Sequence, residues 1–407
     1  MADMIETKKK KQRTDRHIPL RMYYEAYYSF RRHCRDTEAQ QAFEASYAYN
    51  LFCIRRDVTG RHIALGTSCA FIVKKPCPRE VFAGSIYKRI LDSLCIMILR
   101  PCLDGHFSSR HFNVRKGYGL LQYQHQLYKD MREVTKGYGA KRTAVLDDSG
   151  GAWILGGDIS SYFMSMDKDV VWRKWETVIK VWYGGEYTDE LLYIMKEIVY
   201  YEPEKHCIRK SPIGEWKLIK PNKSLFTNGD GKGMPIGDLM SQYTALLLLQ
   251  DFCMFLEDSV EKVGVYMDDW YAIGNHNELL ALLPLARDKL KEVSLKLNEH
   301  KTYLQPICHG LKTCGCFAYP DRVYVSNRVV NNAWQTMLYY NDHLRGDAIR
   351  FCQRMNSYFG IQSHFKTYRI RKELVHLVPT EWWDKVYVEG HYEKFAIRKN
   401  NQLKKSQ

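Results

Sequence analysis

The order of apolar and polar residues predicts a chain of mixed helices and strands. Apolar residues recur at helical spacing in six segments: 22–30, 81–103, a run that follows 119 and ends at 131, 170–200, 239–256 and 279–297. The helix over 81–103 is expected to stop at Pro101, because proline lacks the amide hydrogen that continues a helix. The strand-like segments are 67–73 and 153–155, and 263–273 is typical of a tight hairpin. Residues 202–228 show neither period and are expected to be irregular.

This element order predicts an α+β fold built on an antiparallel sheet. Four large apolar residues form one stripe on the helical segment 170–200: Trp172, Trp175, Ile179 and Trp182. Such a stripe is more typical of a core than of a platform for stacked bases. With 407 residues, the chain is long enough for two or three subdomains with sizeable cores.

The charge of the chain points to its partners. It has 61 Lys and Arg against 46 Asp and Glu, which gives a net charge of +15. Such an excess indicates a polyanion, either nucleic acid or an acidic membrane surface, although a basic surface also serves solubility alone. The basic tails around Lys8–Lys11 and Lys404–Lys405 either add nucleic-acid contacts or are simply solvated.

No membrane span or export signal is visible in the sequence. The longest apolar run near the middle, Ala245–Leu249, is far below the roughly 20 residues of a spanning helix. No apolar stretch follows Lys8–Lys11, so we expect a cytoplasmic protein without membrane contact. The 12 cysteines fit a reducing compartment. One group resembles a zinc site only loosely, so zinc is not favoured: Cys308, His309, Cys314 and Cys316.

The most informative segment for chemistry is Val265–Trp270, in which the adjacent Asp268 and Asp269 are flanked by apolar residues. Two carboxylates are costly to bury in a strand, whereas at a hairpin turn they can point toward a common opening. A third acid, Asp158, follows the strand at 153–155. If the two strands lie side by side, three carboxylates meet at one point and suit Mg²⁺. Two such ions would support phosphoryl transfer to a 3′-hydroxyl by lowering its pKa and holding the triphosphate.

These segments resemble the reverse transcriptases. Tyr266-Met267-Asp268-Asp269 matches the Tyr-x-Asp-Asp motif of that family, and Asp158 followed by Phe163 matches its first catalytic motif. The resemblance implies a right-hand polymerase with fingers, a palm and a helical thumb, which copies RNA into DNA with two Mg²⁺ ions or with Mn²⁺ in their place. Asp158, Asp268 and Asp269 would be catalytic and bind metal, assisted by the backbone carbonyl of Ile159.

Further segments follow the family's order, so the resemblance extends over about residues 67–325. It implies that Phe163 excludes the 2′-hydroxyl of ribonucleotides and that Lys301 approaches the triphosphate. Arg115 and Lys116 would grip the triphosphate, since a guanidinium can fork onto phosphate oxygens. A generic basic turn that holds template phosphates is the alternative. Two other segments resemble family motifs, one of the fingers and one of the primer grip: 78–83 and 312–317.

One motif narrows the choice within the family. Most reverse transcriptases carry Gln-Gly, three further residues and Ser-Pro, where this chain has Ile236, Gly237 and, at the end, Ser241-Gln242. This variant is similar to the enzymes of diversity-generating retroelements, which copy a template RNA with frequent errors at adenines (mutagenic retrohoming). Ile236, Gly237 and Gln242 would contact the incoming nucleotide. Isoleucine offers contact area, whereas glutamine offers hydrogen bonds. Loss of such a hydrogen bond reduces the difference in binding free energy between correct and mismatched nucleotides. Alternatively, Ile236 only packs and fidelity is ordinary.

The resemblance also implies partners and a division of the chain. The partners are template RNA, the cDNA or primer, dNTPs and a small basic accessory protein that forms a pentamer, in a bacterium or a phage-infected host. The expected parts are a basic extension (1–36), fingers with the start of the palm (37–150), a palm (151–320) with an insertion at about 170–228, and a thumb with a basic tail (321–407). No RNase H or endonuclease domain is expected.

Two other functions stay open. One is a reverse transcriptase of another bacterial lineage, of the retron, intron or antiphage-defence type. The Ile236 motif argues against the retron and intron types. The other is a catalytically silent RNA-binding scaffold. The presence of all three acids argues against a scaffold, because nothing but chemistry maintains a costly cluster of negative charge.

Overall fold

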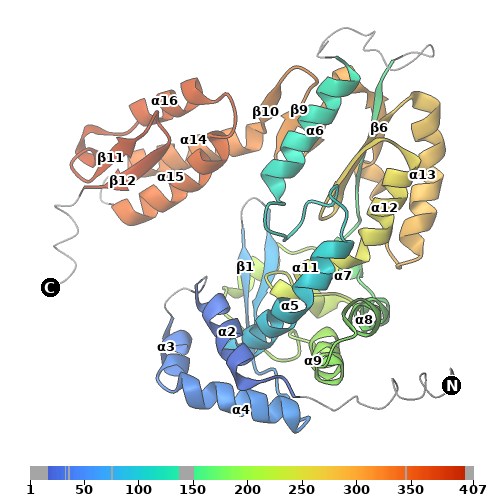
Figure 1. Ribbon diagram of the computed structural model, residues 1–407. Coiled ribbons are helices and arrows are strands. Elements are labelled where there is room, and N and C mark those ends of the chain that lie inside the picture. The colour runs from blue at the N-terminus through green and yellow to red at the C-terminus, as the bar shows by residue number, and fades with distance from the viewer. Residues whose placement is uncertain are drawn as a thin grey trace. The chain divides into compact units, whose positions relative to one another are not determined.

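The structure, a computed structural model, describes residues 17–32, 34, 37–74, 77–136, 151–343 and 346–398. The basic tails discussed above lie outside these residues. The chain forms two compact units (Figure 1). Unit 1 comprises Met1–Gly119, Gly157–Trp270 and Ala281–Thr302, and unit 2 comprises Leu120–Gly156, Tyr271–Leu280 and Tyr303–Gln407. The four parts expected from the sequence stay a prediction.

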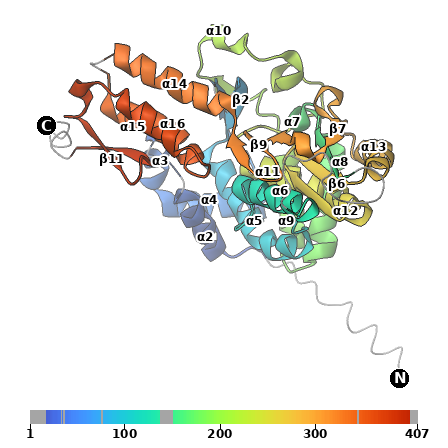
Figure 2. The same ribbon diagram turned by 90° about the horizontal axis from the view of Figure 1, so that it is seen from above.

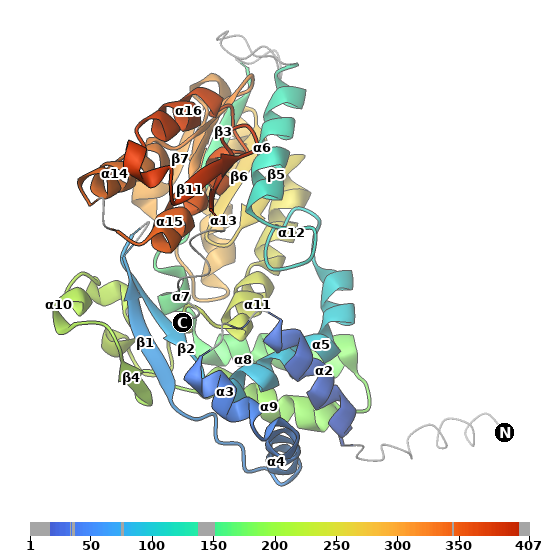
Figure 3. The same ribbon diagram turned by 90° about the vertical axis from the view of Figure 1, so that its left-hand side faces the viewer.

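Unit 1 is mainly helical. Its helices are α2 (Leu20–Arg31), α3 (Glu38–Glu44), α4 (Tyr47–Thr59), α5 (Ile86–His106), α7 (Tyr162–Ser165), α8 (Lys168–Thr177), α9 (Thr188–Tyr200), α10 (Ile213–Trp216), α11 (Leu239–Leu248), α12 (Gln250–Ser259) and most of α13 (His276–Lys291). A π-helix, Val178–Tyr183, continues α8. Helix α5 contacts α2, α9 and α11, because its Leu91, Leu94 and Leu99 are fully buried (Figure 3).

A small sheet of unit 1 has the strand order β2-β1-β4, built from β1 (Ser68–Val73), β2 (Arg79–Ala83) and β4 (Cys207–Arg209). Strand β1 pairs antiparallel with β2, with Cys69 opposite Ala83, and parallel with β4, with Ser68 opposite Cys207. The strand predicted at 67–73 is confirmed. The segment 202–228, predicted to be irregular, contains only short elements: β4, the four-residue α10 and two 3-10 helices, Pro221–Lys223 and Leu225–Thr227.

The prediction of one helix over 81–103 was wrong at both ends. Residues 81–83 belong to β2, and α5 begins after Ser85, whose Oγ accepts from the amide of Lys88 at 3.1 Å. The helix continues past Pro101 to His106. Pro101 removes one amide donor and crowds the carbonyl four residues before it, but the fully buried Leu103 continues the apolar face beyond it. Similarly, the helix predicted to reach 297 ends at Lys291, and Ser294 takes a left-handed backbone with φ 60°.

The segments that carry Asp158, Asp268 and Asp269 lie on a four-stranded sheet with the order β5-β6-β3-β7. Its strands are β3 (Trp153–Asp158), β5 (Lys262–Tyr266), β6 (Asp269–Gly274) and β7 (Tyr303–Pro306). Strand β3 pairs antiparallel with β7, with Ile154 opposite Gln305. Strands β5 and β6 form the predicted hairpin, and β3 is the predicted strand that leads to Asp158. The mixture of helices and antiparallel strands therefore agrees with the predicted α+β class.

Unit 2 contains α6 (Leu120–Val134), a small antiparallel sheet and a C-terminal helical group. The sheet has the order β10-β9-β8, with β8 (Leu311–Thr313), β9 (Cys316–Ala318) and β10 (Val323–Val325). Helices α14 (Asn327–Asp342), α15 (Ala348–Gln362) and α16 (Tyr368–His376) pack with the hairpin of β11 (Val386–Glu389) and β12 (Lys394–Ile397) (Figure 2). Phe351, Trp382 and Phe395 lie at the centre of this core. The predicted mostly helical C-terminal part thus also includes a hairpin.

Among the described residues, one helical segment is long and apolar enough to cross a membrane, Leu239–Ser259. Within that segment, 72% of the most apolar window is buried inside the protein. Leu246, Leu247 and Leu248 are among its buried side chains. Such burial is typical of a core helix in a soluble protein.

Candidate active site

Asp158 and Asp268 lie next to each other in unit 1. Asp158 ends β3 and is 5% exposed, and Asp268 sits in the turn between β5 and β6. The amide of Ile159, which follows Asp158, donates to the backbone carbonyl of Asp268 at 3.0 Å. The two carboxylate motifs, about a hundred residues apart in sequence, are therefore joined by a direct backbone hydrogen bond.

The turn that carries Asp268 is held by the segment 112–113. Met267 has a left-handed backbone with φ 52°, which is unfavourable for a residue with a side chain. The side-chain oxygen of Asn113 accepts from the amide of Met267 at 2.7 Å, and Asn113 is fully buried. Beside it, Phe112 donates to the carbonyl of Val265 at 2.8 Å. The segment around Asn113 therefore stabilises the shape of the carboxylate turn.

Two side chains from the loop after α13 hold the carboxylate of Asp158. Lys301 donates to one oxygen at 2.7 Å, and the amide of the Asn298 side chain donates to the other at 2.8 Å. The backbone amide of Asn298 also donates to the carbonyl of Asp158 at 2.8 Å. The structure thus brings the predicted Lys301 into the site, and it adds Asn298, which no sequence motif had singled out.

The electrostatics of the site favour a cation. Burial, and then the negative charge of Asp158, raise the pKa of Asp268 above its ordinary value, although Lys301 and Arg79 partly offset this shift. Partial burial alone lowers the pKa of Lys301, but its contact with Asp158 more than compensates, so that the net shift is upward. Two close carboxylates with only one lysine in contact leave excess negative charge, which a divalent cation neutralises.

The donor set for such a cation is incomplete within the chain. Among the described residues, no three side chains of His, Cys, Asp or Glu are grouped closely enough to hold a metal ion. Asp158 and Asp268 supply carboxylate oxygens, and Asp269 is near enough to act on the charge of Lys301. These oxygens suit Mg²⁺, which commonly binds one or two carboxylates and takes its other ligands from water and phosphates. The cysteines and the histidine of the group around Cys316 are likewise not arranged as a metal site in the described part of the chain.

Arg115 does not take the place expected for a residue that grips a triphosphate. It is 7% exposed, and its guanidinium donates to the backbone carbonyls of Phe107, Ser108 and His111 at 3.3, 2.6 and 2.5 Å. It also lies 3.9 Å from the ring centre of Tyr118. Arg115 therefore braces its own loop. Lys116 is exposed, and the arginine whose charge acts on Asp268 is Arg79 at the start of β2.

Phe163 and Ile236 share one apolar cluster. Both are partly buried and pack against the same buried side chains: Ala70, Phe82, Met164 and Leu225. The turn at Ile236 is fixed to β2, because its carbonyl accepts from the amide of Phe82 at 2.9 Å. Gln242 lies in the first turn of α11, and its amide donates to the carbonyl of Asp238 at 3.3 Å. The predicted nucleotide contacts at 163 and 236 are thus neighbours in space.

No protein-family model and no curated protein matches the chain. Among solved structures, it is similar to telomerase from Candida albicans in complex with a fragment of telomeric RNA, with a TM-score of 0.46 and 11% identity over 78% of this chain and 55% of that chain. It is also similar to apo telomerase from Candida tropicalis, with a TM-score of 0.44 and 10% identity over 77% of this chain and 62% of that one. The chain spans less than two thirds of these telomerase chains. What it does is therefore inferred from its own site.

The tryptophan stripe divides into two environments. Trp175 and Ile179 are fully buried, so the core role predicted for them is confirmed. Trp182 is only partly buried and stacks on His106, with ring centres 4.3 Å apart. This part of the stripe covers the end of α5.

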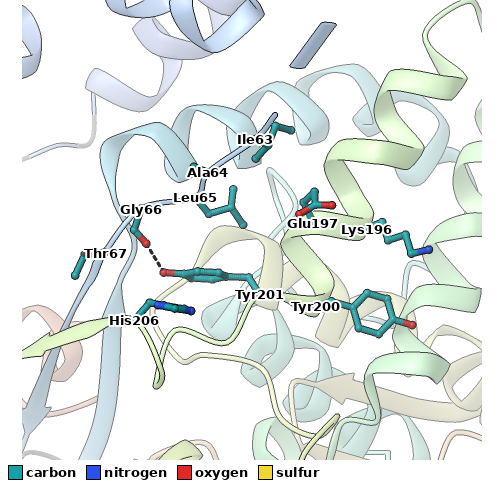
Figure 4. A pocket seen from close by; sticks show the side chains of 10 residues that line it. All are labelled: Ile63, Ala64, Leu65, Gly66, Thr67, Lys196, Glu197, Tyr200, Tyr201 and His206. Atoms are coloured by element: carbon teal, nitrogen blue, oxygen red, sulfur yellow. Dashed lines mark hydrogen bonds between the residues drawn. The ribbon is translucent and has the colours of Figure 1, made fainter. Parts of the chain in front are cut away.

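A hollow of about 560 Å³ lies elsewhere in unit 1, between the segment 63–67 and the end of α9 (Figure 4). Tyr201 projects into it and donates to the carbonyl of Gly66 at 2.6 Å. The ring of Tyr201 is nearly parallel to that of His206, at 6.4 Å between ring centres. Among the described residues that line the hollow, none is a predicted site residue.

Proposed function

We propose that this chain is an RNA-directed DNA polymerase of the right-hand type. The observation that carries the proposal is that the backbone hydrogen bond from Ile159 to Asp268 brings Asp158 and Asp268 together. Lys301 donates to the carboxylate of Asp158 at the same place. The Tyr-x-Asp-Asp resemblance supplies the reaction class, and the excess of basic residues suits template RNA and a DNA primer.

In this proposal Asp158 and Asp268 would hold Mg²⁺, assisted by the carbonyl of Ile159, with Asp269 close by. When bound, Mg²⁺ supplies charge for the triphosphate and lowers the pKa of the attacking 3′-hydroxyl. The chain's own residues prepare the site: Asn298 orients Asp158, and Lys301 offsets part of its charge. Lys301 and Arg79 are then positioned to meet the phosphates of an incoming dNTP, because both already act on Asp268.

We further propose that the enzyme belongs to a diversity-generating retroelement and copies adenines with frequent errors. Ile236, in place of an orienting glutamine, supports this assignment, since its side chain offers packing but no hydrogen bond. The partners proposed with it are a template RNA, the growing cDNA and a small basic accessory protein that forms a pentamer.

Primer extension tests both levels of the proposal. The purified chain is given an RNA template with all four bases, a DNA primer, dNTPs and Mg²⁺, and the cDNA is sequenced. We expect product from the wild type and none from the Asp268→Ala, Asp269→Ala double variant. Asp288→Ala removes an exposed carboxylate on α13 instead and should leave synthesis unchanged. Loss of the metal ligands should lower the rate by several powers of ten, because charge stabilisation is usually the largest catalytic contribution.

Three outcomes decide between the possible functions. Errors concentrated opposite template adenines support the retroelement assignment. Uniform fidelity contradicts it and favours another lineage of reverse transcriptase. If the chain makes no product, even with the RNA and small proteins encoded beside its gene, but still binds RNA, the polymerase proposal is wrong and the scaffold function is favoured.

A further inference from the structure

Three ionisable side chains are buried together beside the turn that carries Ile236 and Gly237. Lys88 of α5 donates to Asp92, one helical turn further on, at 2.9 and 3.1 Å, and to Asp238 at 2.5 Å. The side chains of Lys88, Asp92 and Asp238 are 2%, 1% and 8% exposed. We call these three residues the buried ion cluster.

The two carboxyl groups of the buried ion cluster differ in acidity. Although burial alone lowers the pKa of Lys88, the carboxylates of Asp238 and Asp92 raise it overall. Burial, and then the charge of Asp238, raise the pKa of Asp92 well above its ordinary value. Burial opposes ionisation of Asp238 as well, but Lys88 and a hydrogen bond with Asp92 lower its pKa overall. One lysine is therefore shared between two carboxyl groups, of which Asp238 is the stronger acid and Asp92 the weaker.

Such a cluster is an inefficient way to stabilise a core. Taking ions out of water costs several kcal/mol each, and well-packed apolar side chains of similar size usually do as well or better. In some proteins buried hydrogen-bonded polar groups instead fix one defined geometry. The cluster lies beside the turn Ile236–Asp238, so this turn is the part of the chain whose geometry it can fix.

Asp238 connects the cluster to two elements. It is covalently next to Gly237, and its second carboxylate oxygen caps α11 by accepting from the amide of Met240 at 3.3 Å. Its first oxygen is held by Lys88 of α5. The end of the turn is therefore fixed to α5 and α11 at one point.

The other side of the turn lies against β2. Gly237 has φ 102°, and a Cβ atom there would lie 2.6 Å from Cγ1 of Val81. The carbonyl of Ile236 accepts from Phe82 of the same strand. The turn is thus clamped between β2 on one side and the buried ion cluster on the other, and Ile236 has little freedom to move.

We propose that the buried ion cluster is a positioning device for the turn Ile236–Asp238, which sets how tightly and how selectively the incoming nucleotide is held without touching it. The inference rests on the proposed polymerase function. Loss of the cluster allows the turn to shift. If the turn contributes contacts that the bound dNTP and the transition state share equally, their loss raises KM and leaves kcat unchanged.

Single-nucleotide incorporation by the full chain tests this inference, together with thermal unfolding of each variant. Lys88→Met removes the only cation of the cluster. We expect the KM for the correct dNTP to rise about tenfold, with kcat changed by less than about threefold, because the turn orients the nucleotide and does not carry the reaction. The ratio of wrong to right incorporation should change in the same variant.

A triple variant separates positioning from stability. Lys88→Met, Asp92→Leu and Asp238→Asn together leave no buried charge and keep an oxygen to cap α11. We expect this variant to regain most of the melting temperature but not the KM of the wild type. If it regains both, the cluster is only structural and the inference is wrong. The triple variant also decides the matter if Lys88→Met alone does not fold.

Glu190→Gln is the matched control. Glu190 is a buried carboxylate of α9 that accepts from His17 and from the amide of Ile18, both at 2.7 Å. Its loss should lower stability without a change in KM. An equal rise in KM in this control would overturn the inference, since any destabilised variant would then behave alike. A wild-type chain that incorporates no nucleotide would instead overturn the proposed function and the inference together.

Discussion

At the scale of single residues, Gly157 is the most constrained position beside the carboxylates. A Cβ atom there would lie 2.3 Å from Cε2 of Trp270, whose indole is 1% exposed. The close approach lets Trp270, directly after the Asp-Asp pair, pack against the strand that carries Asp158. The sequence identified Asp158 but could not show why glycine precedes it, because the contact joins residues more than a hundred positions apart.

Replacement of Gly157 should therefore harm both stability and catalysis. We expect Gly157→Ala to lower the free energy of unfolding by about 1–3 kcal/mol, the usual effect of overpacking a core. Primer extension should fall as well, since Asp158 is the next residue. The control is Gly105→Ala in α5, where a Cβ atom meets nothing within 4 Å. That variant should be neutral or stabilised by roughly 0.5–1 kcal/mol, because alanine favours a helix over glycine. Equal melting temperatures for the two variants would contradict the packing argument.

At the scale of elements, the local sequence pattern predicted that a helix or strand exists better than it predicted where the element ends or what it packs against. The strand to Asp158 and the hairpin around Asp268 were predicted because apolar runs end at charged residues. Residues 81–83 were assigned to a helix, since Val81 and Phe82 suit either period, and only the pairing with β1 makes them a strand. Lys88 and Asp92 have the spacing of an ordinary surface ion pair on a helix. Nothing local shows that they are buried against Asp238.

The hairpin turn offers a prediction at this scale. Asn113→Ala removes the acceptor for the amide of Met267 and leaves that partly buried amide without this partner. We expect a loss of about 1–3 kcal/mol in the free energy of unfolding and a lower kcat, because the turn positions Asp268. Asn50→Ala removes a comparable contact, to the carbonyl of Phe43, in α4. It should cost stability without reducing kcat per folded molecule. An unchanged kcat in Asn113→Ala would show that the turn keeps its shape unaided.

At the scale of the whole molecule, the net charge of +15 governs association more than folding. Affinity for RNA should fall roughly a thousandfold or more between about 50 and about 200 mM KCl if six or more phosphates are contacted. The Asp268→Ala, Asp269→Ala double variant should show the same salt dependence, since it loses chemistry and not basic surface. Filter binding or fluorescence anisotropy with a labelled RNA measures both. A flat salt dependence would mean that the basic residues serve solubility instead.

The contacts between the Asn113 segment and β5 bear on how such a chain can be recombined. The amide of Phe112 bonds the carbonyl of Val265, the amide of Val265 bonds the carbonyl of Arg110, and Asn113 bonds Met267. In a chimera, a hairpin transplanted alone would arrive without the segment that shapes its turn. The exchangeable module is therefore split in sequence: 110–113 and 262–274 have to be inherited from the same parent for the graft to remain active.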